Sequence, residues 1–177
     1  DMVKVKQYIE AHTNDIVEKY KELINLQDFW RNTDAVASVA KWLEEEFTNE
    51  GATCKLIETG EKSGPIFTGI FGKELPGKPV MFCGHMDTAL DSALYSESPF
   101  YIKEGKAYGP GVLDMKGGII ISLYVLKAMK YAGNIHRPIQ FLYAPDEEGC
   151  HLYSHVPDYI QKHSENCLFA FNMETGL

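Results

Sequence analysis

The sequence has 177 residues, of which 45% are hydrophobic, enough for one folded domain with a buried core. Its formal net charge of −8 comes with interspersed acidic and basic residues, so it lacks the basic cluster that nucleic acid requires. No apolar run is long enough to span a bilayer, and the first residues do not resemble a secretory signal. We therefore expect a cytoplasmic protein that binds neither membrane nor nucleic acid, with its four scattered cysteines reduced.

Two helices are predicted in the first 51 residues, one from about Val3 to Leu26 and one over Thr33–Glu50, with Gly51 at the usual position of a left-handed cap. Each has an apolar face with residues three, four or seven positions apart. These residues are Val5, Ile9, Ile16, Tyr20 and Leu23 in the first helix, and Val36, Val39, Ala40, Leu43 and Phe47 in the second.

The middle of the chain changes to short runs rich in β-branched and aromatic residues, separated by glycine and proline. Such runs predict strands at Ala52–Glu58, Pro65–Phe71 and Pro79–Gly84. A hairpin is predicted around Phe100–Tyr108, with Glu104-Gly105 as its turn.

The last third alternates helix and strand. Met115–Ala132 is apolar on nearly all sides, which predicts a helix packed deep on a sheet. Pro138–Ala144 and Cys167–Met173 predict two further buried strands, with a short helix about Val156–His163 between them. This alternation is typical of an α/β fold with a parallel sheet covered by helices.

Six polar residues stand at the ends of these predicted elements. They are His85 and Asp87 after one strand, Glu147 and Glu148 after the next, Glu174 after the last, and Asp114 before the buried helix. The carboxyl ends of parallel strands meet at one edge, so we expect these side chains to converge there. Five carboxylates and one imidazole in one crevice repel one another unless a cation neutralises them, which indicates a divalent metal site.

Each residue also has an ordinary interpretation. His85 alone fits a hydrogen-bonded loop residue and Glu174 an ordinary loop carboxylate. Asp114 fits a helix N-cap. The pair Glu147-Glu148 would usually be a solvated charge run, but here it follows a buried strand. The conjunction of these residues at several strand ends favours the metal site.

Two glycine-rich segments flank Asp114. Gly109-Pro110-Gly111 and Lys116-Gly117-Gly118 could suggest a phosphate loop, but neither the G-x-G-x-x-G nor the P-loop spacing is present. We interpret the glycines as permitting a strained turn and close approach of the helix to the sheet. His151 and His155 follow the glutamate pair closely enough to approach the same cleft.

Four ordered segments resemble the motifs of the M20 metallopeptidases. They are Gly84-His85-Met86-Asp87-Thr88, the run from Gly109 to Gly118, Pro145-Asp146-Glu147-Glu148 and Met173-Glu174-Thr175-Gly176. The family includes carboxypeptidase G2-like enzymes, aminoacylases, succinyl-diaminopimelate desuccinylase and peptidase T. The resemblance implies a three-layer α/β/α catalytic domain with a mostly parallel sheet. It also implies a hydrolase that cleaves amide bonds of peptides or N-acyl amino acids, as a carboxypeptidase-like exopeptidase.

The resemblance implies a role for each polar residue. Asp114 would bridge two zinc ions, with His85 and Glu174 completing one site and Glu148 helping to bind the other; Co²⁺ or Mn²⁺ would also suit these ligands. Asp87 would orient the His85 imidazole. Glu147 would be the general acid/base that takes a proton from the attacking water and returns it to the leaving amine. A cis peptide bond is expected after Asp114.

Two features depart from the family pattern. Gly149-Cys150-His151 stands where the family often has one residue and then Gly-Ser. Family members also continue through a lid domain, which binds substrate and often forms a homodimer, to a final metal-binding histidine. We therefore expect residues 1–177 to be the N-terminal portion of the catalytic domain, without the lid or the C-terminal catalytic segment, and to have weak metal affinity and little or no activity.

Three alternatives remain open at this point. A deacylase of small N-acyl amino acids would use the same metal chemistry. A non-catalytic metal-binding or regulatory domain would share the ligands but would not need Glu147. A nucleotide-binding α/β domain would be stabilised by phosphate without metal.

Overall fold

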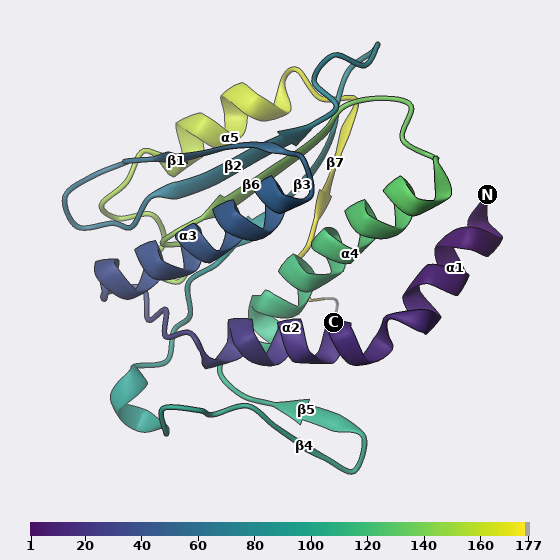
Figure 1. The fold of residues 1–177 in the computed structure, drawn as a ribbon. Helices are drawn as coiled ribbons and strands as arrows, with labels where there is room; N and C mark the ends of the chain where they lie inside the picture. Colours follow the sequence, from purple (N-terminus) through teal and green to yellow (C-terminus); the bar gives the residue numbers. More distant parts are fainter. Residues whose placement is uncertain (176–177) are drawn as a thin grey trace.

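The computed structural model describes residues 1–175, so Gly176 of the last predicted motif and the predicted domain end at Leu177 lie outside the described residues. Figure 1 shows a central sheet with helices on both sides. The helices are α1 Met2–Ala11, α2 Thr13–Asn25, α3 Thr33–Asn49, α4 Gly117–Ala132 and α5 Val156–Ser164, with short helical turns at Ser92–Leu94 and Val112–Lys116. The strands are β1 Thr53–Ile57, β2 Ile66–Phe71, β3 Val80–His85, β4 Tyr101–Lys103, β5 Lys106–Tyr108, β6 Ile139–Ala144 and β7 Phe169–Asn172.

The main sheet has the strand order β1-β2-β6-β3-β7. Strand β3 lies between β6 and β7 and is parallel to both. Strand β2 pairs antiparallel with β1 and with β6, so it alone runs against the other four. The predicted mostly parallel sheet is therefore confirmed. The register places His85 opposite Ala144 and Cys83 opposite Asn172, so β3, β6 and β7 end at the same edge.

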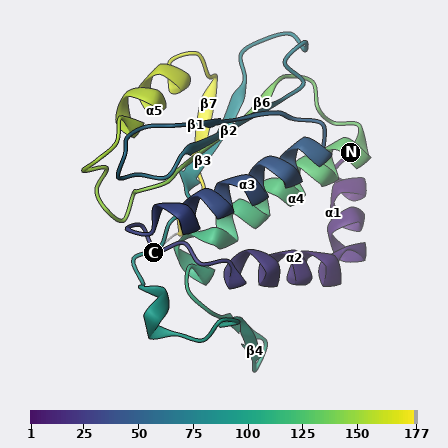
Figure 2. The same cartoon turned by 60° about the vertical axis from the view of Figure 1, so that its left-hand side comes forward.

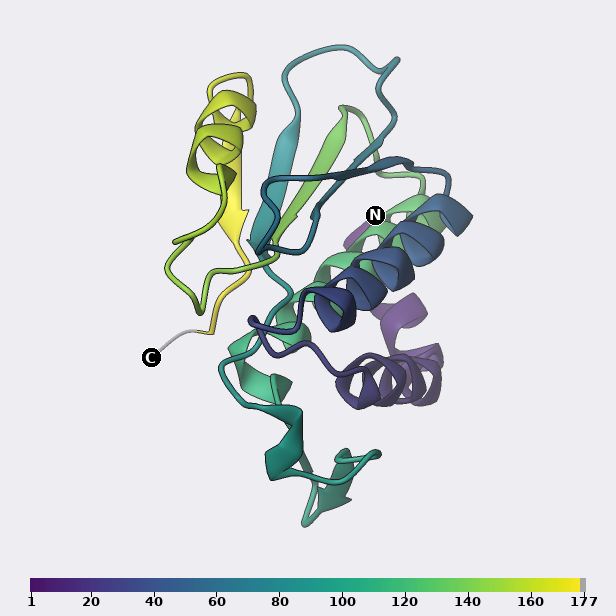
Figure 3. The same cartoon turned by 90° about the vertical axis from the view of Figure 1, so that its left-hand side faces the viewer.

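Alternating side chains of the central strands build a core on each face of the sheet. Phe141 and Tyr143 of β6 belong to the larger core under α3 and α4, whereas Leu142 and Ala144 belong to a smaller one that includes Val156 of α5. Figures 2 and 3 show α1 to α4 together on one side and α5 on the other. The predicted three-layer α/β/α arrangement is confirmed.

The predicted N-terminal helix is interrupted. It breaks at His12, whose φ of −109° and ψ of 17° are not helical, and the chain then turns into α2. The ring of His12 stacks on Tyr8 at 3.9 Å, and its Nδ1 lies 2.7 Å from the Tyr8 carbonyl oxygen. The apolar period continues across the break because both helices pack on the same core, so periodicity alone did not reveal it.

Other predictions need smaller corrections. The strand predicted at Cys167–Met173 forms as β7 but is exposed, because it lies at the outer edge of the sheet. The helix predicted from Met115 begins at Gly117, since Asp114 and Met115 have non-helical backbone angles. The hairpin β4–β5 is confirmed, with Glu104 and Gly105 both in the left-handed region that such turns require. The four cysteines are free thiols. Among residues 1–175, the helices lack the length and apolar character needed to cross a bilayer.

The aromatic core beneath α3 should dominate the stability of the domain. Phe47 is 0% exposed, and its ring lies 4.5 Å from that of Phe141 and 5.3 Å from that of Phe67. We expect Phe47→Ala to lower the free energy of unfolding by about 3–5 kcal/mol, because the lost contacts leave a cavity. Urea denaturation measures this change. Leu94→Ala, at a 74% exposed position, is the control, and an equal loss in both variants would contradict the assignment.

Candidate metal centre

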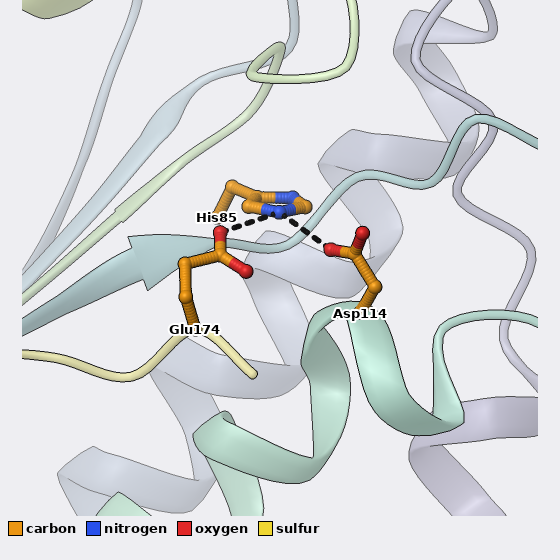
Figure 4. A group of neighbouring side chains, drawn as sticks. All are labelled: His85, Asp114 and Glu174. Carbon is orange, nitrogen blue, oxygen red and sulfur yellow. Dashed lines mark hydrogen bonds and ion pairs between the residues drawn. The ribbon is translucent and has the colours of Figure 1, made fainter. Parts of the chain in front are cut away.

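Three of the predicted ligands meet at the carboxyl ends of the parallel strands. His85 is the last residue of β3, Glu174 follows β7, and Asp114 lies in the turn before α4. Figure 4 shows the imidazole between the two carboxylates. His85 Nε2 lies 2.9 Å from Glu174 Oε1 and 3.1 Å from Asp114 Oδ1, and one ligand atom from each residue lies within 4.8 Å of the others. One imidazole with two carboxylates suits Zn²⁺, Co²⁺ or Mn²⁺.

The local charges show why this cluster favours a cation. Burial lowers the pKa of the His85 imidazole, but the surrounding carboxylates, Asp87 first, raise it to about 9. Burial raises the pKa of Glu174 and of Glu148, and the nearby Asp114 carboxylate raises both further. Without a metal, His85, Glu148 and Glu174 therefore hold protons more tightly than isolated groups would. A divalent cation would replace those protons and satisfy the same carboxylates.

Asp87 organises two of the loops that form the site. Its carboxylate is 0% exposed, and Oδ1 lies 3.2 Å from His85 Nδ1, as expected for a group that orients the imidazole. The same carboxylate also accepts hydrogen bonds from the backbone N–H groups of Glu147 and Glu148, at 3.1 and 3.0 Å. The sequence did not predict this second role, because it depends on how the loops after β3 and β6 meet.

Two glycines allow the site-bearing elements to come this close. A Cβ atom on Gly84 of β3 would lie 2.3 Å from the sulfur of Met115, the residue after Asp114. A Cβ atom on Gly118 of α4 would lie 2.1 Å from the carbonyl oxygen of Met173, the residue before Glu174. The predicted close approach of helix and sheet is thus confirmed at Gly118. The expected cis peptide bond between Asp114 and Met115 is also present.

Glu147 and His151 line a cavity of about 360 Å³ together with His85 and Glu174. Glu147 Oε2 lies 3.7 Å from His85 Nε2. His151 Nδ1 lies 2.8 Å from the Oδ1 atom of the buried Asp146, which raises the pKa of the imidazole. The sequence placed His151 near the cleft but missed Asp146, whose role becomes visible only once the loop after β6 is folded.

Glu148 and His155 are not members of the three-residue cluster, although Glu148 lies near it. Glu148 shares a second cavity, of about 280 Å³, with Asp114, so Asp114 borders the cluster and this cavity. His155 is exposed at the start of α5. The site therefore consists of the tight group His85, Asp114 and Glu174, with Glu147 beside it and Glu148 across Asp114.

The fold and the cluster together define an α/β domain with a candidate metal site at the carboxyl edge of its sheet. The sequence profile of Peptidase family M20/M25/M40 matches residues 81–175, and the chain belongs to this family.

Similar proteins agree with this assignment. The chain is 30% identical over 164 residues to carboxypeptidase G2 of Pseudomonas sp. (strain RS-16), covering 90% of this chain and 38% of that protein. It is 30% identical over 162 residues to succinyl-diaminopimelate desuccinylase of Pelagibacter ubique (strain HTCC1062), covering 85% of this chain and 40% of that protein. The structure of human carnosine dipeptidase 1 has the same fold, with a TM-score of 0.84 at 18% identity over 96% of this chain and 40% of that one. The chain thus spans about two fifths of the length of these relatives.

Asp87 offers a direct test of how the site is held together. We expect Asp87→Asn to lower the free energy of unfolding by about 1–3 kcal/mol, because the amide nitrogen cannot accept one of the buried N–H groups. Urea denaturation of the metal-free protein measures this. Asp158→Asn, at an exposed carboxylate in α5, should change little. Equal stability of the two variants would show that Asp87 does not tie the loops together.

Proposed function

We propose that this chain supplies most of the active site of a two-zinc hydrolase that cleaves amide bonds at the ends of peptides or in N-acyl amino acids. The observation that carries the proposal is the contact of one buried imidazole with two carboxylates, with Glu147 beside them. Family membership supports it, since the relatives are named as a carboxypeptidase and a desuccinylase.

The proposed ligand roles rest on which ligand atoms lie close together and on which side chains share a cavity. His85, Asp114 and Glu174 would hold one ion, and Asp114 with Glu148 would contribute to the second. Bound zinc would supply Lewis acidity that polarises the scissile carbonyl group. Asp87 fixes the orientation of the His85 ring through Nδ1, which leaves Nε2 directed at the cluster.

Glu147 would move the proton. Its side chain is half exposed, so water and substrate can reach it, while its backbone is anchored by Asp87. The carboxylate would take a proton from the water that attacks the carbonyl carbon, and would return that proton to the nitrogen of the leaving amine. A carboxypeptidase-like exopeptidase and an N-acyl amino acid deacylase both fit this chemistry. Carboxypeptidase G2 as a relative favours the first and the desuccinylase the second.

The general acid/base role of Glu147 can be tested in the full-length protein with dipeptides and N-acyl amino acids as substrates. We expect Glu147→Gln to lower kcat by about 10²–10⁴-fold while the zinc content stays unchanged, because an amide cannot transfer the proton. Glu104→Gln, in the turn of the β4–β5 hairpin, is the matched control. Unchanged activity of Glu147→Gln would favour a non-catalytic metal-binding or regulatory domain, and full activity after chelation of the metal would contradict the metal-dependent mechanism.

We further propose that residues 1–177 are the first part of a longer catalytic domain of a cytoplasmic enzyme, which forms a homodimer through a lid domain. The coverage of about two fifths of each relative supports this. Residues 1–177 alone should bind zinc weakly and show no hydrolysis, because the family resemblance implies a further ligand and a substrate-binding surface in parts of the relatives that this chain does not cover. Isothermal titration with zinc and the same substrate assays measure both properties. Turnover by residues 1–177 equal to that of the full-length protein would contradict this proposal.

A further inference from the structure

We propose that the buried ion pair between Asp28 and Lys116 positions the metal cluster, by fixing the turn that carries Asp114 against the segment that carries His85 and Asp87. The inference rests on the proposed function in one respect, that the cluster binds a divalent cation. It assigns a role to two charged residues that lie outside the cluster.

Lys116 is enclosed by oxygen atoms from the last turn of α2 and from the α2–α3 connection. Its side chain is 0% exposed, and Nζ lies 2.6 Å from Asp28 Oδ2. Nζ also donates hydrogen bonds to the carbonyl oxygens of Leu23 and Leu26, at 3.0 and 2.8 Å. The ammonium group therefore has two carbonyl oxygens as hydrogen-bond acceptors and the Asp28 carboxylate as its ion-pair partner. Since Lys116 follows Asp114 by two residues, these contacts fix the turn before α4 to the end of α2.

Asp28 connects Lys116 to the loop after β3. Its Oδ1 accepts a hydrogen bond from the Thr88 hydroxyl at 3.0 Å, and its carbonyl oxygen accepts the Thr88 backbone N–H at 2.9 Å. Thr88 directly follows Asp87, which contacts His85. The Thr88 carbonyl oxygen in turn accepts the backbone N–H of Trp30 at 3.1 Å. The Asp28 carboxylate therefore contacts two of the three segments that supply the ligands, the one that carries His85 and the one that carries Asp114.

The turn that carries Asp114 depends on such contacts, because regular helix geometry does not define it. Asp114 has φ −118° and ψ 102°, and Met115 has φ −130° and ψ 33°. Side chains from neighbouring elements hold the turn at both ends. Tyr20 of α2 donates a hydrogen bond to the Val112 carbonyl oxygen, and Lys116 makes the contacts described above.

Stability alone does not explain a buried charge pair at this position. Removing two charges from water costs about as much as their attraction returns, and apolar residues of similar size would commonly stabilise a core equally well or better. The pair differs from apolar contacts in its geometry, because Asp28 must face Lys116 and Thr88 at fixed distances. This geometry provides a defined spacing between Asp114 and His85, which a metal site requires.

The experiment measures the zinc dissociation constant of the full-length protein by competition with a chelator, together with the thermal unfolding of the metal-free protein. Lys116→Met should weaken zinc binding by about tenfold or more, a loss typical of groups that orient metal ligands. Thr88→Val, which removes only one hydroxyl, should weaken it in the same direction by a smaller factor. Lys130→Met is the matched control, because Lys130 lies in α4, the helix that directly follows Lys116, and pairs with Glu50 at 2.8 Å, away from the cluster. Its zinc affinity should stay within about twofold of wild type, as for independent distant sites.

Two further variants separate the possible failures. His85→Ala should abolish most zinc binding, and if it does not, the proposed metal site is wrong whatever Lys116 does. Lys116→Met leaves the buried Asp28 carboxylate without its ion-pair partner. If this variant therefore does not fold, the double variant Asp28→Asn/Lys116→Met, which also removes the Asp28 charge, replaces the single variant in the comparison. Wild-type zinc affinity in a folded Lys116→Met, in the folded double variant or in Thr88→Val would overturn the positioning role, even where thermal stability falls.

Discussion

Repulsion between carboxylates at one edge of the sheet is the constraint on which the rest of the structure depends. Strands β3, β6 and β7 end at the same level of the sheet. The acidic residues that follow these strands therefore gather beside Asp114, which precedes α4. Two like charges about 5 Å apart repel by about 3 kcal/mol at an effective dielectric constant of 20, before further screening by solvent. That is a large part of the stability of an ordinary domain. A cation among these groups turns the repulsion into attraction, which links metal binding to the integrity of the site.

The side chains that position the metal ligands are buried, whereas two of the three ligands are partly exposed. His85 is 1% exposed, but the Asp114 side chain is 56% exposed and Glu174 30%. Asp87 ties the His85 loop to the loop of Glu147 and Glu148, and the pair Asp28–Lys116 ties it to the turn of Asp114. The partly exposed carboxylates are thus attached to backbone segments that buried side chains hold in place. Such an arrangement leaves room for substrate while keeping the geometry that a metal requires.

Local patterns in the sequence predicted most of the fold and the position of the cluster. The strand that ends at His85, the strand before Glu147 and the helix after Asp114 are strongly apolar, so the sequence predicted their ends to within two residues. The break at His12 was missed because the apolar face continues from one helix into the next. The exposure of β7 was missed because the sequence of one strand does not reveal whether that strand lies at the centre or at the edge of the sheet. Asp28, Lys116 and Asp146 were missed because their contacts join residues far apart in the chain or depend on loop geometry.

The central claim is that His85, Asp114 and Glu174 share a metal ion. Anomalous diffraction at the zinc absorption edge, from zinc-saturated crystals of the full-length protein, tests it most directly. An anomalous peak about 2.0–2.2 Å from His85 Nε2 and from a carboxylate oxygen of each of the other two residues is the predicted result. Well-ordered side chains with no peak among them, or zinc bound only elsewhere, would contradict it.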